Sequence, residues 1–562
     1  MNRKQRRAQE KVAAAAPPRH AVQPAGFAQA SRLNDEAIAL YGAGKLPEAI
    51  AASKQAVARA PGHAPFHNNL GELLRLAGEA EPAMASLDRA IALDPQHAEA
   101  HSNRGNLLRQ LRRTDEAIAS YRTALAIRPD YPEAMVNLGA ALQDARDFPA
   151  AIAVLRRAIA LNPKLPMAHQ NLGLALIAQG DLAGAESAIA MAAQLSPSAI
   201  DIQLAFGDLE RGKGNLDAAL RWYEQAWRQQ PGHGGAHMRY GSALMLKGDY
   251  AQAWPHFGAR WNLAEMEVDK RPFTLPFWKG EPVPPQKKML LFTEQGVGES
   301  LALFSLVPEL LGCGIAPVIE CDPRMVPLLE RSFPGLEILA RTAPANPRLF
   351  ADDLAVQASL FDVAAVFRRS PADCKGALPL RADANRAAML RARYKQGGDL
   401  PLVGIAWHSG NPKLGAPKSA QLTDFAPFLA LPGIRFVDLQ YGNREADRAA
   451  LKAACGAEIF YDPEIDQLKD LDAFAAQVAA MDMVITTSNT TAHMAGALGK
   501  PTWVLLHKGI SPHWYWGLTG ETTPWYPTMR LLRQEQAADW RGLADRVARE
   551  LPAQLASTTS AA

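Results

Sequence analysis

The chain has 562 residues, 48% of them hydrophobic and 21% charged, with a formal net charge of +3. This length allows several domains, and this composition is ordinary for soluble globular proteins. No run approaches the roughly 18 apolar residues of a transmembrane helix, and no signal peptide is recognised at the start of the sequence, so we expect neither feature. The cysteines show neither metal-ligand nor paired spacing, as expected in a reducing cytoplasm. They are Cys313, Cys321, Cys374 and Cys455.

The first eleven residues carry five basic side chains and one acidic, a net +4. Such a segment could contact acidic lipid or nucleic acid. Because an Ala/Pro-rich stretch follows, we interpret 1–29 as a disordered, solvated leader and linker, and we predict no nucleic-acid partner.

A period of 34 residues runs through the N-terminal half. Glycine, proline and alanine each recur at this interval, and the glycines are Gly71, Gly105, Gly139, Gly173, Gly207 and Gly241. Glycine on a first helix and alanine on a second let two antiparallel helices approach closely, while proline ends the second helix. The pattern resembles the tetratricopeptide repeat family and predicts an all-α superhelix of seven repeats over 30–267. The predicted repeat starts are Ala30, Ala64, Ala98, Pro132, Pro166, Ile200 and Gly234.

The last repeat departs from the pattern. Arg260 and Glu265 stand where alanine and proline are expected. We therefore expect a capping unit that leads into a different structure.

Four consecutive repeats carry asparagine at their sixth position, namely Asn69, Asn103, Asn137 and Asn171. First-helix positions of this kind face the concave groove of the superhelix, where a row of amides can bond an extended peptide backbone whatever its side chains. The row resembles the repeats of protein O-GlcNAc transferase. A single asparagine could bond locally on a polar helix face, but four in register favour a peptide groove.

The composition changes after Leu263. Proline and aromatic residues are frequent over 268–288, which we interpret as an ordered linker. Short apolar runs then predict strands at 289–293, 318–321, 402–407, 436–440, 483–486 and 502–506, with helices between them. These elements predict two Rossmann-like α/β domains, 289–400 and 401–562.

A dinucleotide site is one alternative for the first of these domains. Gly296 and Gly298 open a helix, and Glu320 follows about 20 residues later, as that fingerprint asks. However, Leu301 stands where the third glycine belongs, and a second α/β half follows. Two Rossmann-like halves that face a cleft form the GT-B architecture of nucleotide-sugar glycosyltransferases, which we favour.

Motifs of the second half carry a closer resemblance. They are Gly404–Asn411, Lys418-Ser419, Leu439–Gly442, Ser488–His493 with Gly499-Lys500-Pro501, and Pro524–Pro527 with Arg530. Together they resemble the heptosyltransferase-like glycosyltransferases that follow tetratricopeptide repeats in many bacterial proteins, a layout shared by flagellin-modifying enzymes. We expect an enzyme that needs no cofactor, and the cysteine pattern favours a cytoplasmic location. The enzyme would move a sugar from a nucleotide-sugar donor to a protein acceptor, with flagellin as the leading candidate.

The loop 487–491 follows a predicted buried strand and runs into a helix that we expect to begin near Ala492. Free N–H groups and the positive helix end there can bind a pyrophosphate, with the Thr490 and Thr491 hydroxyls as further donors. Helix capping by Asn489 is the alternative. Lys418 matches a basic residue of the resembling family, and Trp407 could contact a base or belong to the core. The predicted donor-binding residues are Trp407, His408, Lys418, Gln440, Tyr441, Ser488, Asn489, Thr490, Thr491 and His493.

Inverting transfer needs a base that takes the proton of the acceptor hydroxyl. The resembling family has an aspartate after glycine in the first β-α loop, and this chain has Glu299 after Gly298, a carboxylate with a longer reach. We predict Glu299 as the base, with His493 and then His408 as the next candidates. A glutamate that only stabilises the first turn of a helix is the alternative.

Two acidic patterns bear on metal use and activity. Many members of the resembling family have aspartate where Ser488 stands. Asp470-Leu471-Asp472 looks like a metal-binding D-x-D, but it opens a predicted helix, so we expect N-capping and no metal. Two functions remain: an inverting, metal-independent glycosyltransferase that acts on a protein held by the repeats, and a peptide-binding scaffold with a degenerate transferase domain.

Overall fold

A computed structural model of the chain forms two compact units, residues 1–171 and 172–562. It describes residues 26–263, 266, 271, 273–294, 296–374, 376, 380–410, 415–508, 514–536 and 538–559. Residues 1–25 of the predicted leader and linker, Glu265 and Asn411 lie outside these residues, whereas 27–29, predicted as disordered, belong to the first helix. No described helix is both long and apolar enough to cross a membrane.

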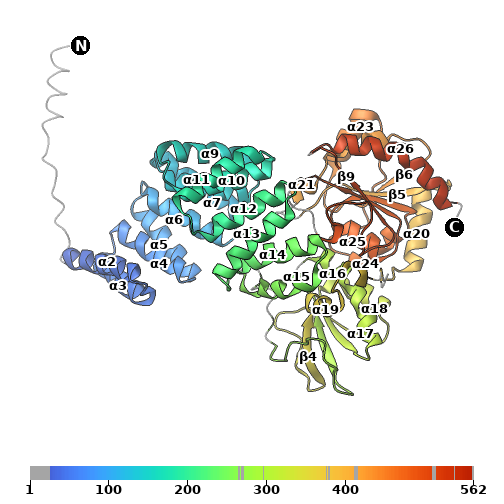
Figure 1. Cartoon of the computed structure of the whole chain (residues 1–562), viewed down its shortest axis with the longest axis horizontal. Coiled ribbons are helices and arrows are strands. Elements are labelled where there is room, and N and C mark those ends of the chain that lie inside the picture. Colours follow the sequence, from blue (N-terminus) through green and yellow to red (C-terminus); the bar gives the residue numbers. More distant parts are fainter. Residues whose placement is uncertain are drawn as a thin grey trace, which may run out of the picture. The chain divides into compact units, whose positions relative to one another are not determined.

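Helices α2 to α15 follow one another as pairs, coloured blue to green in Figure 1. They are α2 (Phe27–Gly42), α3 (Leu46–Arg59), α4 (Ala64–Leu76), α5 (Ala80–Leu93), α6 (Ala98–Gln110), α7 (Thr114–Ile127), α8 (Pro132–Asp144), α9 (Phe148–Leu161), α10 (Pro166–Gln179), α11 (Leu182–Leu195), α12 (Ile200–Gly212), α13 (Leu216–Gln229), α14 (Gly234–Lys247) and α15 (Tyr250–Phe257). The predicted repeat starts coincide with the first residues of α4, α6, α8, α10, α12 and α14. Only the first helix differs, since it begins at Phe27 rather than at Ala30.

The recurring glycines make room for a large side chain on the second helix of the same pair. A Cβ atom added to Gly105 would lie 2.6 Å from Tyr121 Cε1, and one added to Gly207 would lie 2.2 Å from Tyr223 Cε1. Both tyrosine rings are fully buried. The predicted close approach of paired helices is therefore confirmed, and its main partner is this large residue.

The first sheet follows the repeats. Its strands are β1 (Lys288–Phe292), β2 (Pro317–Cys321), β3 (Glu337–Ala340) and β4 (Leu354–Ser359), all parallel, in the order β3-β2-β1-β4. The helices between and after them are α16 (Val297–Leu303), α17 (Val307–Gly312), α18 (Val326–Ser332) and α19 (Leu360–Phe367). Strand order reverses between β1 and β4, which is where parallel sheets open a crevice for ligands.

The second sheet is also parallel. Its strands are β5 (Leu402–Ala406), β6 (Arg435–Asp438), β7 (Met483–Thr487), β8 (Thr502–Leu506) and β9 (Met529–Arg533), in the order β6-β5-β7-β8-β9. Its helices are α20 (Ala384–Lys395), α21 (Gly415–Lys418), α22 (Ala426–Leu429), α23 (Glu445–Cys455), α24 (Leu471–Ala479), α25 (Thr490–Ala497) and α26 (Trp540–Thr559). Here the strand order reverses between β5 and β7. Helix α20, within the range predicted for the first α/β domain, packs against α24 of the second.

Side chains of this sheet alternate between two layers, as the period of two in a strand requires. Ile405 and Ile485 belong to a core shared with α22 and α26, whereas Val484 and Val504 join α24 and α25. Figure 1 shows the sheet between α23 and α26 on one side and α24 and α25 on the other.

The seventh repeat belongs to the same core as the first sheet. One cluster of buried side chains includes Tyr250, Trp254 and Phe257 of α15 together with Leu291 of β1 and Phe361 of α19. Trp254 Nε1 also donates a hydrogen bond of 2.5 Å to the Arg368 carbonyl. The capping role expected for this repeat thus includes an apolar interface with the α/β part of its unit.

The turn inside each pair uses one left-handed residue, which also recurs every 34 positions. Glycine fills it at Gly44, Gly78, Gly180, Gly214 and Gly248, with φ between 76° and 88°, whereas Arg112 and Arg146 adopt φ of 63° and 62°. A side chain in this conformation costs roughly 1 kcal/mol or more.

We expect Arg146→Gly to raise the free energy of unfolding by up to about 1 kcal/mol, because it relieves this backbone strain. Gly78→Ala is the matched opposite change at the same turn position. A Cβ atom there would meet nothing within 4 Å, so only strain acts, and stability should fall by about 1 kcal/mol. Urea denaturation of the two variants measures both effects. Equal midpoints for the wild type and both variants would contradict the strain.

Candidate active site

The loops that follow three neighbouring strands are tied together at the strand-order reversal of the second sheet. Gln440 Oε1, after β6, accepts the N–H groups of Trp407 at 3.0 Å and His408 at 2.7 Å, both after β5. Asn489 Nδ2, after β7, donates to the His408 carbonyl at 3.3 Å. The structure therefore brings His408, Gln440 and Asn489 into one contact, with Gln440 buried as the link.

Helix α25 begins at Thr490, two residues earlier than expected, and Asn489 caps it. Asn489 Oδ1 accepts the N–H groups of Thr491 at 3.0 Å and Ala492 at 3.3 Å, as well as the Thr486 hydroxyl at 3.0 Å. Two of the amides predicted to be free for a pyrophosphate are thus already bonded, a correction in favour of the capping alternative for Asn489. The positive helix end remains, with the half-buried Thr490 beside it.

The hydroxyl of Thr491 has a different environment. The residue is fully buried, and its Oγ1 has no hydrogen-bond partner among the described residues. A buried hydroxyl without a partner is costly, about 1–3 kcal/mol.

His493 is enclosed by aromatic rings. Its Nδ1 lies 2.9 Å from Tyr526 Oη, and Trp516 stacks on it with the ring centroids 5.1 Å apart. Burial, and secondly the positive charge of Lys418, lowers the pKa of His493 to about 3. The imidazole is therefore neutral near pH 7, and its low pKa makes it a weak general base there.

Lys418 ends the short helix α21 and is buried. Its positive charge is the second cause of the lowered pKa of His493, the fourth residue of α25. A buried cation and a helix N-terminus each favour a nearby anion.

Three predicted donor-binding residues form hydrogen bonds within the protein: Trp407, Tyr441 and Ser488. Trp407 is fully buried, and its Nε1 donates to Asp447 Oδ2 at 2.9 Å, which supports the core alternative for this side chain. Tyr441 is half-buried, and its hydroxyl accepts the N–H of Gly410. Ser488 Oγ accepts Trp516 Nε1 at 2.8 Å.

Glu299 approaches this site from the first α/β half. It lies in the first turn of α16, half-buried, with Oε2 2.7 Å from where a Cβ atom on Gly296 would stand. Helix α16 packs against α25, and a Cβ atom on Gly298 would lie only 3.0 Å from His493 Cδ2. The glycine before Glu299 therefore permits the contact between the two halves.

Two tyrosines near Glu299 were not predicted as site residues. Burial, followed by the negative charge of Glu299, raises the pKa of both Tyr515 and Tyr526 well above the ordinary value. The Tyr515 hydroxyl has no hydrogen-bond partner among the residues that the structure describes. The run of three aromatic residues at 514–516 is the sequence signal that could have pointed to this region.

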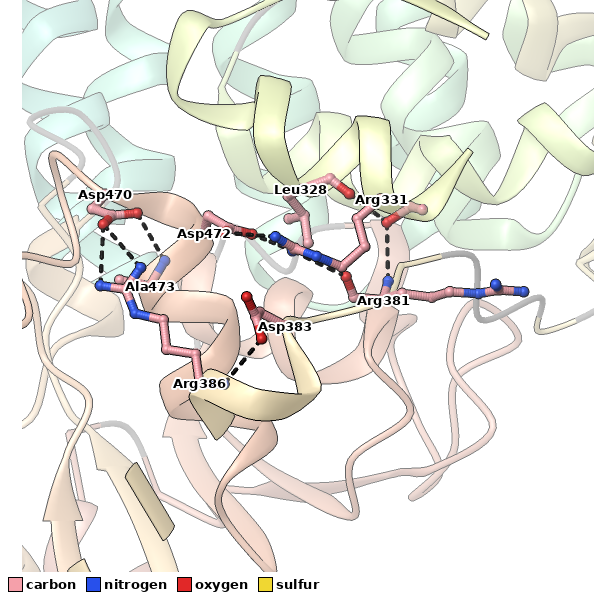
Figure 2. A network of polar contacts seen from close by, with 9 residues as sticks. Leu328, Arg331, Arg381, Asp383, Arg386, Asp470, Asp472 and Ala473 are labelled. Atoms are coloured by element: carbon pink, nitrogen blue, oxygen red, sulfur yellow. Dashed lines mark hydrogen bonds and ion pairs between the residues drawn. The ribbon is translucent and has the colours of Figure 1, made fainter. Parts of the chain in front are cut away.

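The two aspartates of the D-x-D pattern bind different arginines instead of sharing one binding position (Figure 2). Asp470 Oδ1 caps α24 by accepting the Ala473 N–H at 2.8 Å, as predicted, and its other oxygen lies 3.3 Å from Arg386. Asp472 binds Arg331 of α18 through both oxygens, at 2.5 and 2.9 Å. Within the described residues no group of three or more His, Cys, Asp or Glu side chains is arranged to hold a metal ion.

The carboxylate that a dinucleotide site would use to bind a ribose is also bonded within the protein. Glu320, at the end of β2, is fully buried and bonded by Arg271. Arg271 bonds only Oε1, and Oε2 has no hydrogen-bond partner among the described residues, so it is the full burial of this carboxylate that disfavours a ribose contact.

The asparagine row divides into two parts in the first unit. Asn103 Nδ2 donates to Asn68 Oδ1 at 3.0 Å, Asn68 contacts Asn69 at 3.4 Å, and Asn69 Nδ2 donates to Asn34 Oδ1 at 2.9 Å. Asn69 and Asn103 therefore link neighbouring repeats, which is local bonding rather than a free row. Asn137 forms no such bond with any described residue, and like Asn171 it is half-buried.

Comparison with known proteins identifies the repeats. Family profiles described as tetratricopeptide repeats match residues 40–107, 105–145, 136–200 and 204–266, so this region is a tetratricopeptide repeat array. The chain is 34% identical to Protein FlbA of Caulobacter vibrioides over 370 residues, 62% of this chain. It spans 60% of the length of that relative.

Solved structures of bacterial proteins are also similar. PilF of Pseudomonas aeruginosa is 20% identical, with a TM-score of 0.34, over 38% of this chain and 97% of that one. The tetratricopeptide protein TTC0263 of Thermus thermophilus is 27% identical, with a TM-score of 0.30, over 32% of this chain and 99% of that one.

The neutral burial of His493 predicts a specific dependence of stability on pH. The folded-state pKa of about 3 lies below the unfolded value of 6.5, so the unfolded chain binds more protons between these values. The free energy of unfolding that neutral His493 contributes is fully present above pH 6.5 and is lost as pH falls toward 3. The stability advantage of the wild type over His493→Gln should thus shrink from pH 7 to 4, by up to about 1.4 kcal/mol per pH unit. Urea unfolding across this range measures it, and a constant difference would contradict a neutral buried imidazole.

Proposed function

We propose that this protein is an inverting, metal-independent glycosyltransferase of the GT-B type that acts on a protein acceptor bound by its repeats. The donor is a nucleotide sugar, held at the strand-order reversal of the second sheet. The repeat-plus-transferase layout makes flagellin the leading acceptor.

The convergence of a buried lysine, a helix N-terminus and a carboxylate carries this proposal. The start of α25 supplies positive potential at the end of β7, the charge of Lys418 acts on His493 of that helix, and Glu299 lies on α16, which packs against α25. A departing nucleotide needs positive potential, and an attacking hydroxyl needs a base, so the two requirements of glycosyl transfer meet here.

The chemical step follows from these positions. The Glu299 carboxylate takes the proton of the acceptor hydroxyl while the acceptor oxygen forms a bond to the anomeric carbon of the donor sugar. The bond between that carbon and the phosphate oxygen breaks, and the nucleotide leaves with the electron pair. Lys418 and the positive end of α25 stabilise the added negative charge, and attack opposite the leaving group inverts the anomeric configuration.

Peptide binding by the repeats is the second part of the proposal. Tetratricopeptide repeats form extended concave surfaces that bind peptides. Because Asn69 and Asn103 are occupied in linking repeats, we assign the amide contacts to Asn137 and Asn171.

A scaffold with a degenerate transferase domain is the alternative. It is favoured by the capping role of Asn489 and by the bond between Ser488 and Trp516, since both residues are then structural. The two functions differ in whether any acceptor gains a sugar.

We expect Glu299→Gln to reduce sugar transfer by about 10²- to 10⁴-fold, the usual contribution of a general base, while nucleotide-sugar binding is kept. Intact-mass spectrometry of acceptor proteins from cells that carry each form measures transfer. A thermal-shift screen with UDP-, ADP-, GDP- and CMP-sugars measures binding, since a ligand stabilises the folded state.

Glu330→Gln is the matched control, because Glu330 is an exposed glutamate of α18 in the same half. It should leave the sugar mass unchanged. If deletion of the gene changes the mass of no protein or glycan, the transferase proposal fails and the scaffold alternative stands.

We expect Asn137→Ala to weaken acceptor-peptide binding by about three- to tenfold, because one amide hydrogen bond is worth about 0.5–1.5 kcal/mol. Asn103→Ala should instead lower the stability of the repeats by a similar free energy, since it removes the bond to Asn68. Fluorescence anisotropy with an acceptor peptide and urea denaturation separate the two effects. Equal losses of peptide binding would mean that the inter-repeat bond at Asn103 opens for the peptide.

A further inference from the structure

Arg260 is a buried cation that the seventh repeat inserts into the first α/β half. Its guanidinium binds both oxygens of Glu294 at 2.7 Å each, and it also donates to Ser359 Oγ and Asp362 Oδ1 at 3.1 Å each. The Arg260 side chain is 2% exposed, and the Glu294 side chain is fully buried. This residue replaces the alanine that the repeats carry at the same position.

These partners lie at the crevice of the first sheet. Glu294 follows β1 and Ser359 ends β4, and the two strands are neighbours, with Phe292 paired to Ser359. Strand order reverses between them, so this is the position where such a sheet would hold a ligand. Here a side chain from the repeat array occupies it.

The same loop leads from Glu294 to the candidate base. Gly296 is two residues further on, and Glu299 lies in the first turn of α16 with its carboxylate against Gly296. Because a bidentate guanidinium contact fixes both position and orientation, the geometry of Glu294 constrains where α16 begins.

A second contact of the seventh repeat reaches the other half of the site. The rings of Tyr250, Trp254 and Phe257 lie within 6.5 Å of Trp514, centroid to centroid. The next two residues, Tyr515 and Trp516, enclose His493.

We propose that Arg260 is a positioning residue for the candidate base, acting through Glu294 on the start of α16, so that the seventh repeat is part of the active site rather than a detachable spacer. The naming of Glu299 as the base rests on the proposed function. Arg260 itself contacts neither donor nor acceptor. The alternative is that the Arg260–Glu294 ion pair only stabilises the core.

Replacing both partners by apolar residues separates these two roles. Loss of one partner leaves a buried charge and destabilises the fold, whereas loss of both is often tolerated. Arg260→Met should therefore lower the melting temperature, and the double variant Arg260→Met with Glu294→Leu should recover most of it. Under the proposal, the double variant still transfers sugar at least tenfold more slowly in kcat, with the KM for the donor unchanged.

Arg368 and Glu309 provide the matched control. This pair is also bidentate, at 3.0 and 2.5 Å, with Arg368 2% exposed, but neither partner lies on the β1–α16 loop. Arg368→Met with Glu309→Leu should leave kcat at the wild-type value.

Hydrogen exchange of the α16 amides gives a readout that does not need activity. In the Arg260/Glu294 double variant these amides should exchange at least tenfold faster than in the wild type, and in the control double variant at the wild-type rate. Unchanged exchange at α16, or a wild-type kcat in the Arg260/Glu294 double variant, would overturn the proposal. If the wild type transfers no sugar, the proposed function fails on its own, and exchange alone then decides whether Arg260 positions α16.

Discussion

Arg260 carries a full positive charge into the interior of its unit, and a buried charge must be matched by well-placed partners. Glu294, Ser359 and Asp362 meet this need, and all three belong to the ends of β1 and β4 or to the helix that follows β4. The seventh repeat therefore has one compatible position against the first sheet. The apolar contacts of Trp254 and Phe257 then complete the same interface.

The repeat array could be predicted almost to the residue because its signals are local. Each repeat packs mainly on its neighbours, so a glycine beside Tyr121 or Tyr223 is decided within one helical pair. The predicted strands were likewise short, apolar and buried on both faces. Strands β3, β4 and β9 were missed because they carry polar or half-exposed residues, such as Glu337, Gln357 and Arg530, that weaken the apolar signal.

The meeting of the loops at the candidate site was predictable, but the hydrogen bonds within it were not. Residues after β5, β6 and β7 had to meet, because parallel strands end at one edge of a sheet. Which side chains remain available there depends on contacts that no short pattern encodes. Asn489 accepts a backbone N–H group of α25, and Trp407 donates a hydrogen bond to Asp447. His493 packs against aromatic residues more than 20 positions away. The departure at Arg260 was visible in the sequence, yet its partners come from segments 34 to 102 residues later.

Both sheets reverse their strand order, but the crevices at the two reversals contain different groups. In the first, the ends of β1 and β4 are joined by the guanidinium of Arg260, so the crevice that could serve a nucleotide holds a side chain instead. In the second, the ends of β5 and β7 are joined through Asn489, and the N-terminus of α25 lies directly after β7. Positive charge in the first crevice is neutralised by Glu294 and Asp362, whereas the second crevice ends at a helix N-terminus that itself favours an anion. Because an ion pair fills the first crevice and a helix N-terminus lies at the second, we propose the nucleotide site at the second sheet and a positioning role for the first.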